Sequence, residues 1–214
     1  LRFFLLPKHR AQSLKNLRLV FPDRSLRELD RIVLRSFRNF GMSIVETLRL
    51  PVEDIAMDGA LILMEDPERF RQLVESRAII VGFHTGNWEL LNNATARCAE
   101  YAVVVRRQKS GGLHRFISEL RTATGALLIP EDRPQGLISA LKRGMICAVL
   151  FDHGSRNARL YATLFDKQVP VPEGVFRLAR TFNRPLVPAA AHRDEKGRMC
   201  VRLFDPLTVV SSQD

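Results

Sequence analysis

The fold of this chain is decided by one stretch, Ala78-Ile79-Ile80-Val81-Gly82-Phe83-His84-Thr85-Gly86-Asn87-Trp88-Glu89-Leu90. An aliphatic run leads into histidine, glycine and asparagine, and a helix-compatible segment follows. This order predicts a strand, a tight turn and a helix. Asn87 is a suitable N-cap for the helix, and Gly86 permits a turn that brings Glu89, in the first helical turn, to face His84.

A histidine beside a carboxylate can act as a general base. The carboxylate fixes the tautomer of the ring and stabilises the imidazolium that forms when a hydroxyl is deprotonated. His84 also follows a buried strand, at the edge where open α/β sheets bind ligands. We therefore predict His84 and Glu89 as catalytic residues; the alternative is a histidine that a nearby acid merely satisfies within the core.

Strands and helices alternate from Ala78 onward, and Val, Ile and Leu fill the strands as continuous runs. Such runs are typical of a sheet covered on both faces. The sequence predicts an α/β fold with a mostly parallel central sheet covered by helices. We expect a basic amphipathic helical segment at residues 1–50 and an α/β domain at residues 51–214, joined as one continuous unit. The expected strands are 78–82, 102–106, 126–129, 145–151, 186–191 and 199–204, and the expected helices are 87–99, 112–124, 134–142 and 173–182.

Two further strands end in polar residues that suit a substrate site. The strand at 102–106 ends in Arg106-Arg107-Gln108-Lys109, a cationic cluster that suits an anionic head group. The strand at 145–151 ends in Asp152-His153. We predict that Arg106, Arg107, Lys109, Asp152 and His153 bind substrate, together with Asn87. Surface charge at the first cluster and a sheet-edge hydrogen bond at the second are the alternatives.

The positive charge is concentrated in the first quarter of the chain. The net charge is +10 and the isoelectric point is near 10.4. Residues 1–49 hold 11 Lys and Arg against four Asp and Glu. A basic surface seeks polyanions, either nucleic acid or an anionic membrane. With only two Tyr and one Trp, side chains for base stacking are scarce, so we expect a membrane partner and no nucleic acid.

The N-terminal residues form two expected helices. Residues 8–20 read as a short basic amphipathic helix. Ser25-Leu26-Arg27-Glu28 is a capping box that opens a long helix with both an apolar stripe and an arginine series. The chain starts Leu1-Arg2-Phe3-Phe4 without an initiator Met and lacks the run of about 18 apolar residues needed for a transmembrane helix. We expect a fragment truncated at both ends, cut just after a membrane anchor.

Several common chemistries are excluded by missing motifs. The sequence has no Gly-x-Gly-x-x-Gly, no Walker A and no Gly-x-Ser-x-Gly. Its histidines form no zinc-ligand pair, and its three cysteines are isolated, which indicates reduced thiols in the cytoplasm. We expect no metal and no cofactor. A histidine base without a protein nucleophile implies that the substrate supplies the nucleophile, a hydroxyl.

Motifs along nearly the whole chain together resemble one known family. They occupy residues 6–7, 16–22, 40–42, 46–51, 84–90, 105–106, 125–130, 141–144, 152–153, 174–180 and 186–188. In this ordered set the chain resembles the bacterial lipid A late acyltransferases of the lauroyl/myristoyl type, within the lysophospholipid acyltransferase superfamily. The resemblance implies a glycerolipid acyltransferase-like fold, with His84 as the base, Glu89 as its partner, and Arg106 and Asp152-His153 near the acceptor or thioester.

The same resemblance implies an enzyme on the cytoplasmic face of the inner membrane. It would move a fatty acyl chain from acyl carrier protein, or from acyl-CoA, to a hydroxyl of a lipid A precursor. Two departures from the family pattern leave the acceptor open, namely Leu164-Phe165-Asp166 and Pro170-Val171-Pro172-Glu173. A lysophospholipid, ornithine lipid or glycolipid acceptor is the alternative. A basic α/β module that binds nucleic acid or membrane is the non-enzyme alternative.

Overall fold

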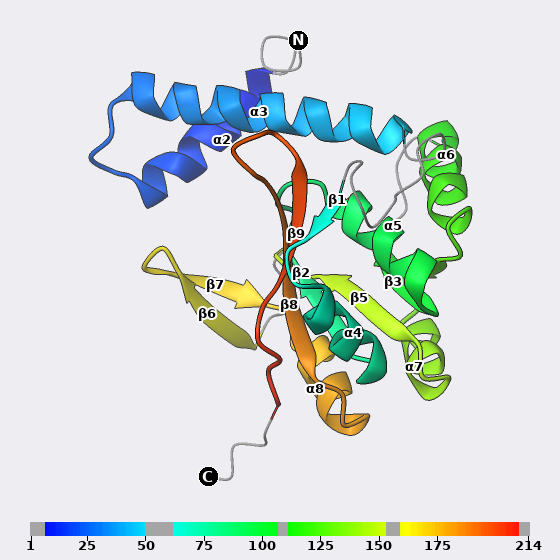
Figure 1. The fold of residues 1–214 in the computed structure, drawn as a ribbon. Helices are drawn as coiled ribbons and strands as arrows, with labels where there is room; N and C mark the ends of the chain where they lie inside the picture. The colour runs from blue at the N-terminus through cyan, green and yellow to red at the C-terminus, as the bar shows by residue number, and fades with distance from the viewer. Residues whose placement is uncertain (1–6, 50–61, 107–110, 153–158, 210–214) are drawn as a thin grey trace.

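A seven-stranded mixed sheet forms the centre of the computed structural model, which describes residues 7–49, 62–106, 111–152 and 159–209 (Figure 1). The strand order is β1-β9-β8-β2-β5-β3-β4. All neighbouring strands run parallel except β8 and β9, which are antiparallel. The predicted α/β fold with a mostly parallel sheet is therefore confirmed. The strands are β1 (Ile62–Met64), β2 (Ile79–Gly82), β3 (Tyr101–Val105), β4 (Leu127–Pro130), β5 (Ile146–Leu150), β8 (Leu186–Arg193) and β9 (Met199–Leu203).

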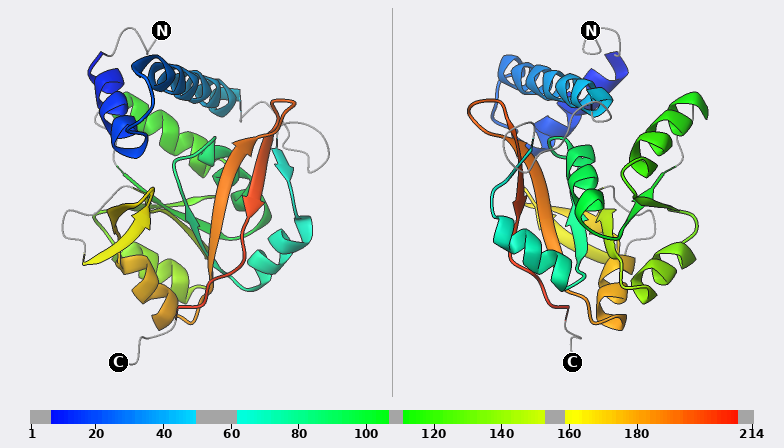
Figure 2. Two further views of the ribbon diagram at one scale, coloured as in Figure 1. Left: turned by 90° about the vertical axis from the view of Figure 1, so that its left-hand side faces the viewer. Right: turned by 45° about the vertical axis from the view of Figure 1, so that its right-hand side comes forward.

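Helices cover both faces of this sheet (Figure 2). Ile80 and Ala148 belong to a core shared with α4, α5 and α6, whereas Ile79 and Cys147 belong to a second core shared with α7 and α8. Neighbouring residues of one strand thus face opposite cores, which explains why the strands are aliphatic without a polar alternation. The helices are α4 (Pro67–Glu75), α5 (Trp88–Cys98), α6 (Gly111–Thr122), α7 (Gln135–Lys142) and α8 (Gly174–Thr181).

Among the described residues, two helices precede the sheet, α2 (Pro7–Val20) and α3 (Leu26–Arg49). The predicted capping box opens α3, because the Ser25 backbone N–H donates to Glu28 Oε2 at 2.8 Å and the Glu28 N–H donates to Ser25 Oγ at 3.4 Å. A bidentate pair between Arg10 and Asp30 joins α2 to α3. Among the described residues, no helix is both long and apolar enough to cross a bilayer.

Four of the described elements were not expected from the sequence. They are β1, α4 and the two strands of a separate antiparallel hairpin, β6 (Leu160–Leu164) and β7 (Lys167–Val171). Every residue of β6 is exposed, so the strand has no buried face that would give it an apolar periodicity. Phe165 and Asp166 connect the two strands with φ of 50° and 57°, the left-handed conformation of a two-residue hairpin turn. The expected boundary at residues 50–51 lies outside the described residues.

Candidate active site

The register of β2 and β5 brings His84 and Asp152 together. Gly82 pairs with Leu150 as the last residues of the two parallel strands. Phe83 and Phe151 follow them, with ring centroids 5.0 Å apart. One residue further on, His84 Nδ1 lies 2.7 Å from Asp152 Oδ1. Both side chains therefore leave the same edge of the sheet at equivalent positions of adjacent strands.

Asp152 holds both the ring and the backbone of His84. The backbone N–H of His84 donates to Asp152 Oδ2 at 2.9 Å, beside the ring contact to Oδ1. Burial alone would raise the pKa of Asp152, but the hydrogen bonds from the His84 ring and backbone outweigh it and hold the pKa below its usual range. An ionised carboxylate accepts the proton of Nδ1–H, so the basic lone pair of the neutral ring lies on Nε2.

The pair can be reached from solvent. The side chains of His84 and Asp152 are 30% and 28% exposed, and the Trp88 ring contacts the His84 ring edge-on with centroids 4.8 Å apart. A partly exposed histidine, oriented through Nδ1 by a carboxylate, is suited to remove a proton from a substrate hydroxyl through Nε2.

Glu89, which was predicted to orient His84, binds two other side chains in the structure. Glu89 lies in the first turn of α5, and its carboxylate is bound by Arg121 of α6 and by the Trp88 indole N–H. The side chain thus contacts α6. Asp152 was expected to bind substrate; in the structure it is the acid that contacts His84.

The Glu89–Arg121 pair gives a stability prediction. Their side chains are only 12% and 16% exposed, so Glu89→Ala would leave the Arg121 charge buried without its partner. We expect a loss of unfolding free energy on the order of 3 kcal/mol, measured by urea denaturation. Glu173→Ala, which removes an exposed pair with Arg177, is the control and should change stability little. An unchanged stability together with lost turnover would restore the catalytic role expected for Glu89.

Asn87 occupies the N-cap position of α5, but its side chain makes no capping hydrogen bond. The residue is 2% exposed, and its amide donates to the Ser43 carbonyl and to Glu46 Oε2, both on α3 and both at 3.1 Å. Because the amide faces α3, the substrate contact expected for Asn87 is replaced by a contact between the His84 turn and α3. Glu46 belongs to one of the motifs that carry the family resemblance, but neither Glu46 nor Ser43 was predicted as a site residue.

Arg106 leaves β3 at the same edge of the sheet as His84 and Asp152. Its Nε donates to both carboxylate oxygens of Glu131 at 2.7 and 3.0 Å, and this hydrogen bonding raises the pKa of Arg106. Val105 pairs with Pro130 in the parallel ladder of β3 and β4, so the register places Arg106 opposite Glu131. The other predicted substrate-binding residues, Arg107, Lys109 and His153, lie outside the described residues.

A second histidine and carboxylate pair lies near the ends of β8 and β1. His192 Nε2 is 3.0 Å from Glu65 Oε1, and the ligand atoms of Glu65, His192 and Cys200 lie within 4.8 Å of one another. Arg202 donates to both oxygens of Glu65, at 2.5 and 3.2 Å, and burial raises the pKa of the Cys200 thiol. The Glu65 carboxylate is already bound by Arg202, and a protonated Cys200 thiol is a poor metal ligand, so we assign no metal to this cluster.

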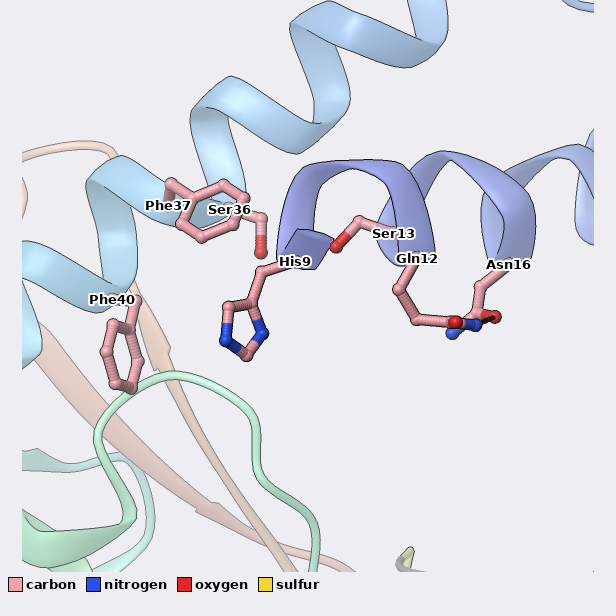
Figure 3. A pocket seen from close by; sticks show the side chains of 7 residues that line it. All are labelled: His9, Gln12, Ser13, Asn16, Ser36, Phe37 and Phe40. Atoms are coloured by element: carbon pink, nitrogen blue, oxygen red, sulfur yellow. Dashed lines mark hydrogen bonds between the residues drawn. The ribbon is translucent and has the colours of Figure 1, made fainter. Parts of the chain in front are cut away.

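A pocket of about 310 Å³ lies between α2 and α3, where His9 of α2 faces the rings of Phe37 and Phe40 of α3 (Figure 3). Gln12 and Asn16 bond to each other across its polar side. Neither His84 nor Asp152 lines it. The candidate site is the edge of the sheet, where His84 and Asp152 are held together.

The fold and the site define an α/β protein with a histidine held by a carboxylate at the carboxyl ends of its parallel strands. The chain belongs to the bacterial lipid A biosynthesis acyltransferase family, whose model matches residues 2–214. This match confirms the resemblance noted from the sequence motifs.

Similar curated proteins carry names from lipid A biosynthesis. The lipid A biosynthesis lauroyltransferase of Escherichia coli (strain K12) is 28% identical over 198 residues, which cover 89% of this chain and 64% of the relative. The palmitoleoyltransferase of the same strain and a lipid A biosynthesis acyltransferase of Shigella flexneri are each 24% identical over 184 residues, covering 82% of this chain and 58% of the relative. The chain thus spans less than two thirds of the length of these relatives.

Proposed function

We propose that the protein transfers a fatty acyl chain from acyl carrier protein, or from acyl-CoA, to a hydroxyl of a lipid A precursor. The observation that carries the proposal is the His84–Asp152 pair at the ends of β2 and β5. Membership of the lipid A acyltransferase family supports the reaction class and the acceptor. The pair provides what the reaction needs, since a neutral hydroxyl attacks a thioester slowly unless its proton is removed.

The proposed mechanism is direct transfer. His84 Nε2 takes the proton of the acceptor hydroxyl as the oxygen attacks the thioester carbonyl carbon, while Asp152 stabilises the imidazolium. The tetrahedral intermediate then collapses, the carbon–sulfur bond breaks, and the imidazolium returns the proton to the leaving thiolate. The products are an ester and a free thiol, so the base is regenerated in each turnover. No covalent acyl-enzyme is formed.

An acceptor panel tests this proposal. Acyl transfer from acyl carrier protein and from acyl-CoA would be measured with a lipid A precursor, a lysophospholipid, an ornithine lipid and a glycolipid, using mass spectrometry of the products. We expect transfer to the lipid A precursor to dominate, and the same ester to disappear from the lipids of a deletion strain. Dominant transfer to another acceptor would contradict the acceptor assignment. No transfer to any acceptor, together with tight binding to duplex nucleic acid, would favour the non-enzyme alternative.

We also propose that α3 docks on an anionic membrane, at the cytoplasmic face of the inner membrane. Its exposed side chains combine large apolar residues, including Leu34, Val45 and Leu48, with a series of arginines. A helix with this composition binds an interface by apolar contact and by attraction to anionic head groups together. Leu29 and Val33 are buried, so a separate face of the helix contacts the protein.

The membrane proposal makes a salt-dependence prediction. Binding to vesicles should require anionic lipid and should weaken as salt rises, since exposed charges are screened beyond about 10 Å at 0.1 M ionic strength. The fraction of protein that floats with vesicles measures this binding. We would compare vesicles of phosphatidylcholine alone with vesicles that also contain phosphatidylglycerol, each at several salt concentrations. Binding that ignores both lipid charge and salt would rule out the electrostatic part of the proposal.

A second prediction concerns Arg106. We propose that Arg106 grips an anionic group of the substrate through two hydrogen bonds from its planar guanidinium fork. In the structure its Nε donates to both carboxylate oxygens of Glu131. Arg106→Lys keeps the charge but loses the fork, so we expect KM to rise about tenfold. Arg31→Lys on α3 is the matched control, because neither substitution alters net charge, and it should leave KM within about twofold. Small and equal changes of KM in the two variants would show that Arg106 does not bind substrate.

A further inference from the structure

We propose that Glu46 and Arg193 position the His84 turn through Asn87, so that α3 is part of the catalytic apparatus without touching substrate. This inference rests on the proposed function for its rate effects, but its geometric part does not need substrate. Ser43, Glu46, Asn87 and Arg193 are called the turn clamp below. They come from three separate elements, namely α3, the turn between β2 and α5, and β8.

The turn clamp centres on a buried amide. Asn87 Nδ2 donates to the Ser43 carbonyl and to Glu46 Oε2, and its Oδ1 accepts from Thr47 Oγ1 at 3.4 Å. Because all three partners lie on α3, this buried amide has one favourable orientation. Asn87 is three residues after His84, so fixing Asn87 fixes the far end of the short turn that carries the base.

Glu46 is in turn fixed by Arg193. The Arg193 guanidinium donates to both Glu46 oxygens, at 2.5 and 2.8 Å, and the side chains of Arg193 and Glu46 are 19% and 15% exposed. Desolvation offsets much of the attraction within such a pair, so a pair of this kind contributes little net stability. It does impose geometry, because the two parallel hydrogen bonds fix the carboxylate oxygen that receives the Asn87 amide.

The same turn is confined from its other side by β8. Ser43 Oγ donates to the Gly86 carbonyl at 3.2 Å. Gly86 has φ of +57°, and a Cβ there would lie 2.0 Å from the Ala191 carbonyl oxygen of β8. The turn therefore lies between α3 and β8 with no room for a side chain at position 86. The Glu46–Arg193 pair of the turn clamp connects these two elements.

The expected consequence is a loss of orientation at the base. The turn clamp contacts the Gly86-Asn87 part of the turn, whereas Asp152 holds His84 itself. Releasing one end of the turn should let the ring leave its productive geometry, and a displacement of about 1 Å can cost on the order of 10²-fold in rate. Substrate affinity should change little, since none of the turn clamp residues is proposed to bind substrate.

A double-mutant cycle tests whether Glu46 acts through Asn87. We expect Glu46→Ala and Asn87→Ala each to lower kcat by on the order of tenfold to a hundredfold, with KM nearly unchanged. The double variant should be no slower than Asn87→Ala, because residues that act through one contact are not additive. Glu65→Ala, which breaks another bidentate arginine pair at a sheet edge, should keep wild-type kcat. If the loss of kcat in the double variant equalled the product of the losses in the two single variants, the proposal would be overturned.

Trp88 provides a readout that needs no substrate. It is the only tryptophan of the chain and its ring contacts the His84 ring, so its fluorescence reports whether that ring stays in place. We expect His84→Ala to change the emission intensity of Trp88. Most of this change should also appear in Asn87→Ala and in the isosteric Glu46→Gln, which preserves the fold better than alanine, whereas Glu65→Ala should keep the wild-type emission. Wild-type emission in folded turn clamp variants would overturn positioning, even if acyl transfer were never detected.

Discussion

Replacing His84 by alanine is expected to lower acyl transfer by a factor of roughly 10²–10⁴, the usual contribution of a general base. The loss should appear in kcat, because the lone pair on Nε2 acts on the reacting hydroxyl and not on a distant part of the substrate. The side chain is 30% exposed, so its removal should leave the fold intact. Initial rates with radiolabelled acyl donor, combined with a melting curve, measure both effects.

His192→Ala is the matched control for His84→Ala. His192 also contacts a carboxylate near a sheet edge, at 3.0 Å from Glu65, but it belongs to the antiparallel part of the sheet. We expect its rate to stay near wild type. A His84→Ala rate within about tenfold of wild type would contradict the mechanism, since the proposed step has no other base.

Asp152→Asn should have an effect nearly as large. The asparagine keeps the shape of the side chain but offers one acceptor oxygen, whereas the aspartate accepts both the Nδ1–H and the backbone N–H of His84. One of these contacts must then be lost or the ring must adopt the other tautomer, which removes the lone pair from Nε2. We expect the rate to fall on the order of 10²-fold or more, with kcat carrying the loss.

Glu173→Gln is the control for the same change of acid to amide. Glu173 pairs with Arg177 on the surface before and within α8, so the substitution should not alter the rate. Comparing Asp152→Asn with Glu89→Ala separates the two candidate acids. If Glu89→Ala lost turnover at full stability while Asp152→Asn stayed active, Glu89 would be the acid that assists His84, and Asp152 would not.

Both members of the observed pair were predicted as site residues from the sequence, but their pairing was not predicted. His84 and Asp152 each follow an aliphatic run and a phenylalanine, Phe83 and Phe151, and this parallel is visible in the sequence. The sequence does not reveal that β2 and β5 are neighbours, since β3 and β4 lie between them along the chain. Glu89 was expected beside His84 because it is near in sequence, and its partner Arg121 is 32 residues away.

The sequence by itself determined the elements that carry the site. Aliphatic runs of strand length, helix caps and a glycine in a tight turn are local properties, and each is set by backbone sterics and by the burial of neighbouring side chains. It also determined that charge gathers in the first helices. Only the tertiary structure decided which side chains meet. Strand order placed Asp152 beside His84, and packing of α3 and β8 on the turn joined Glu46, Asn87 and Arg193, because contacts between distant residues depend on how buried faces dock and not on sequence spacing.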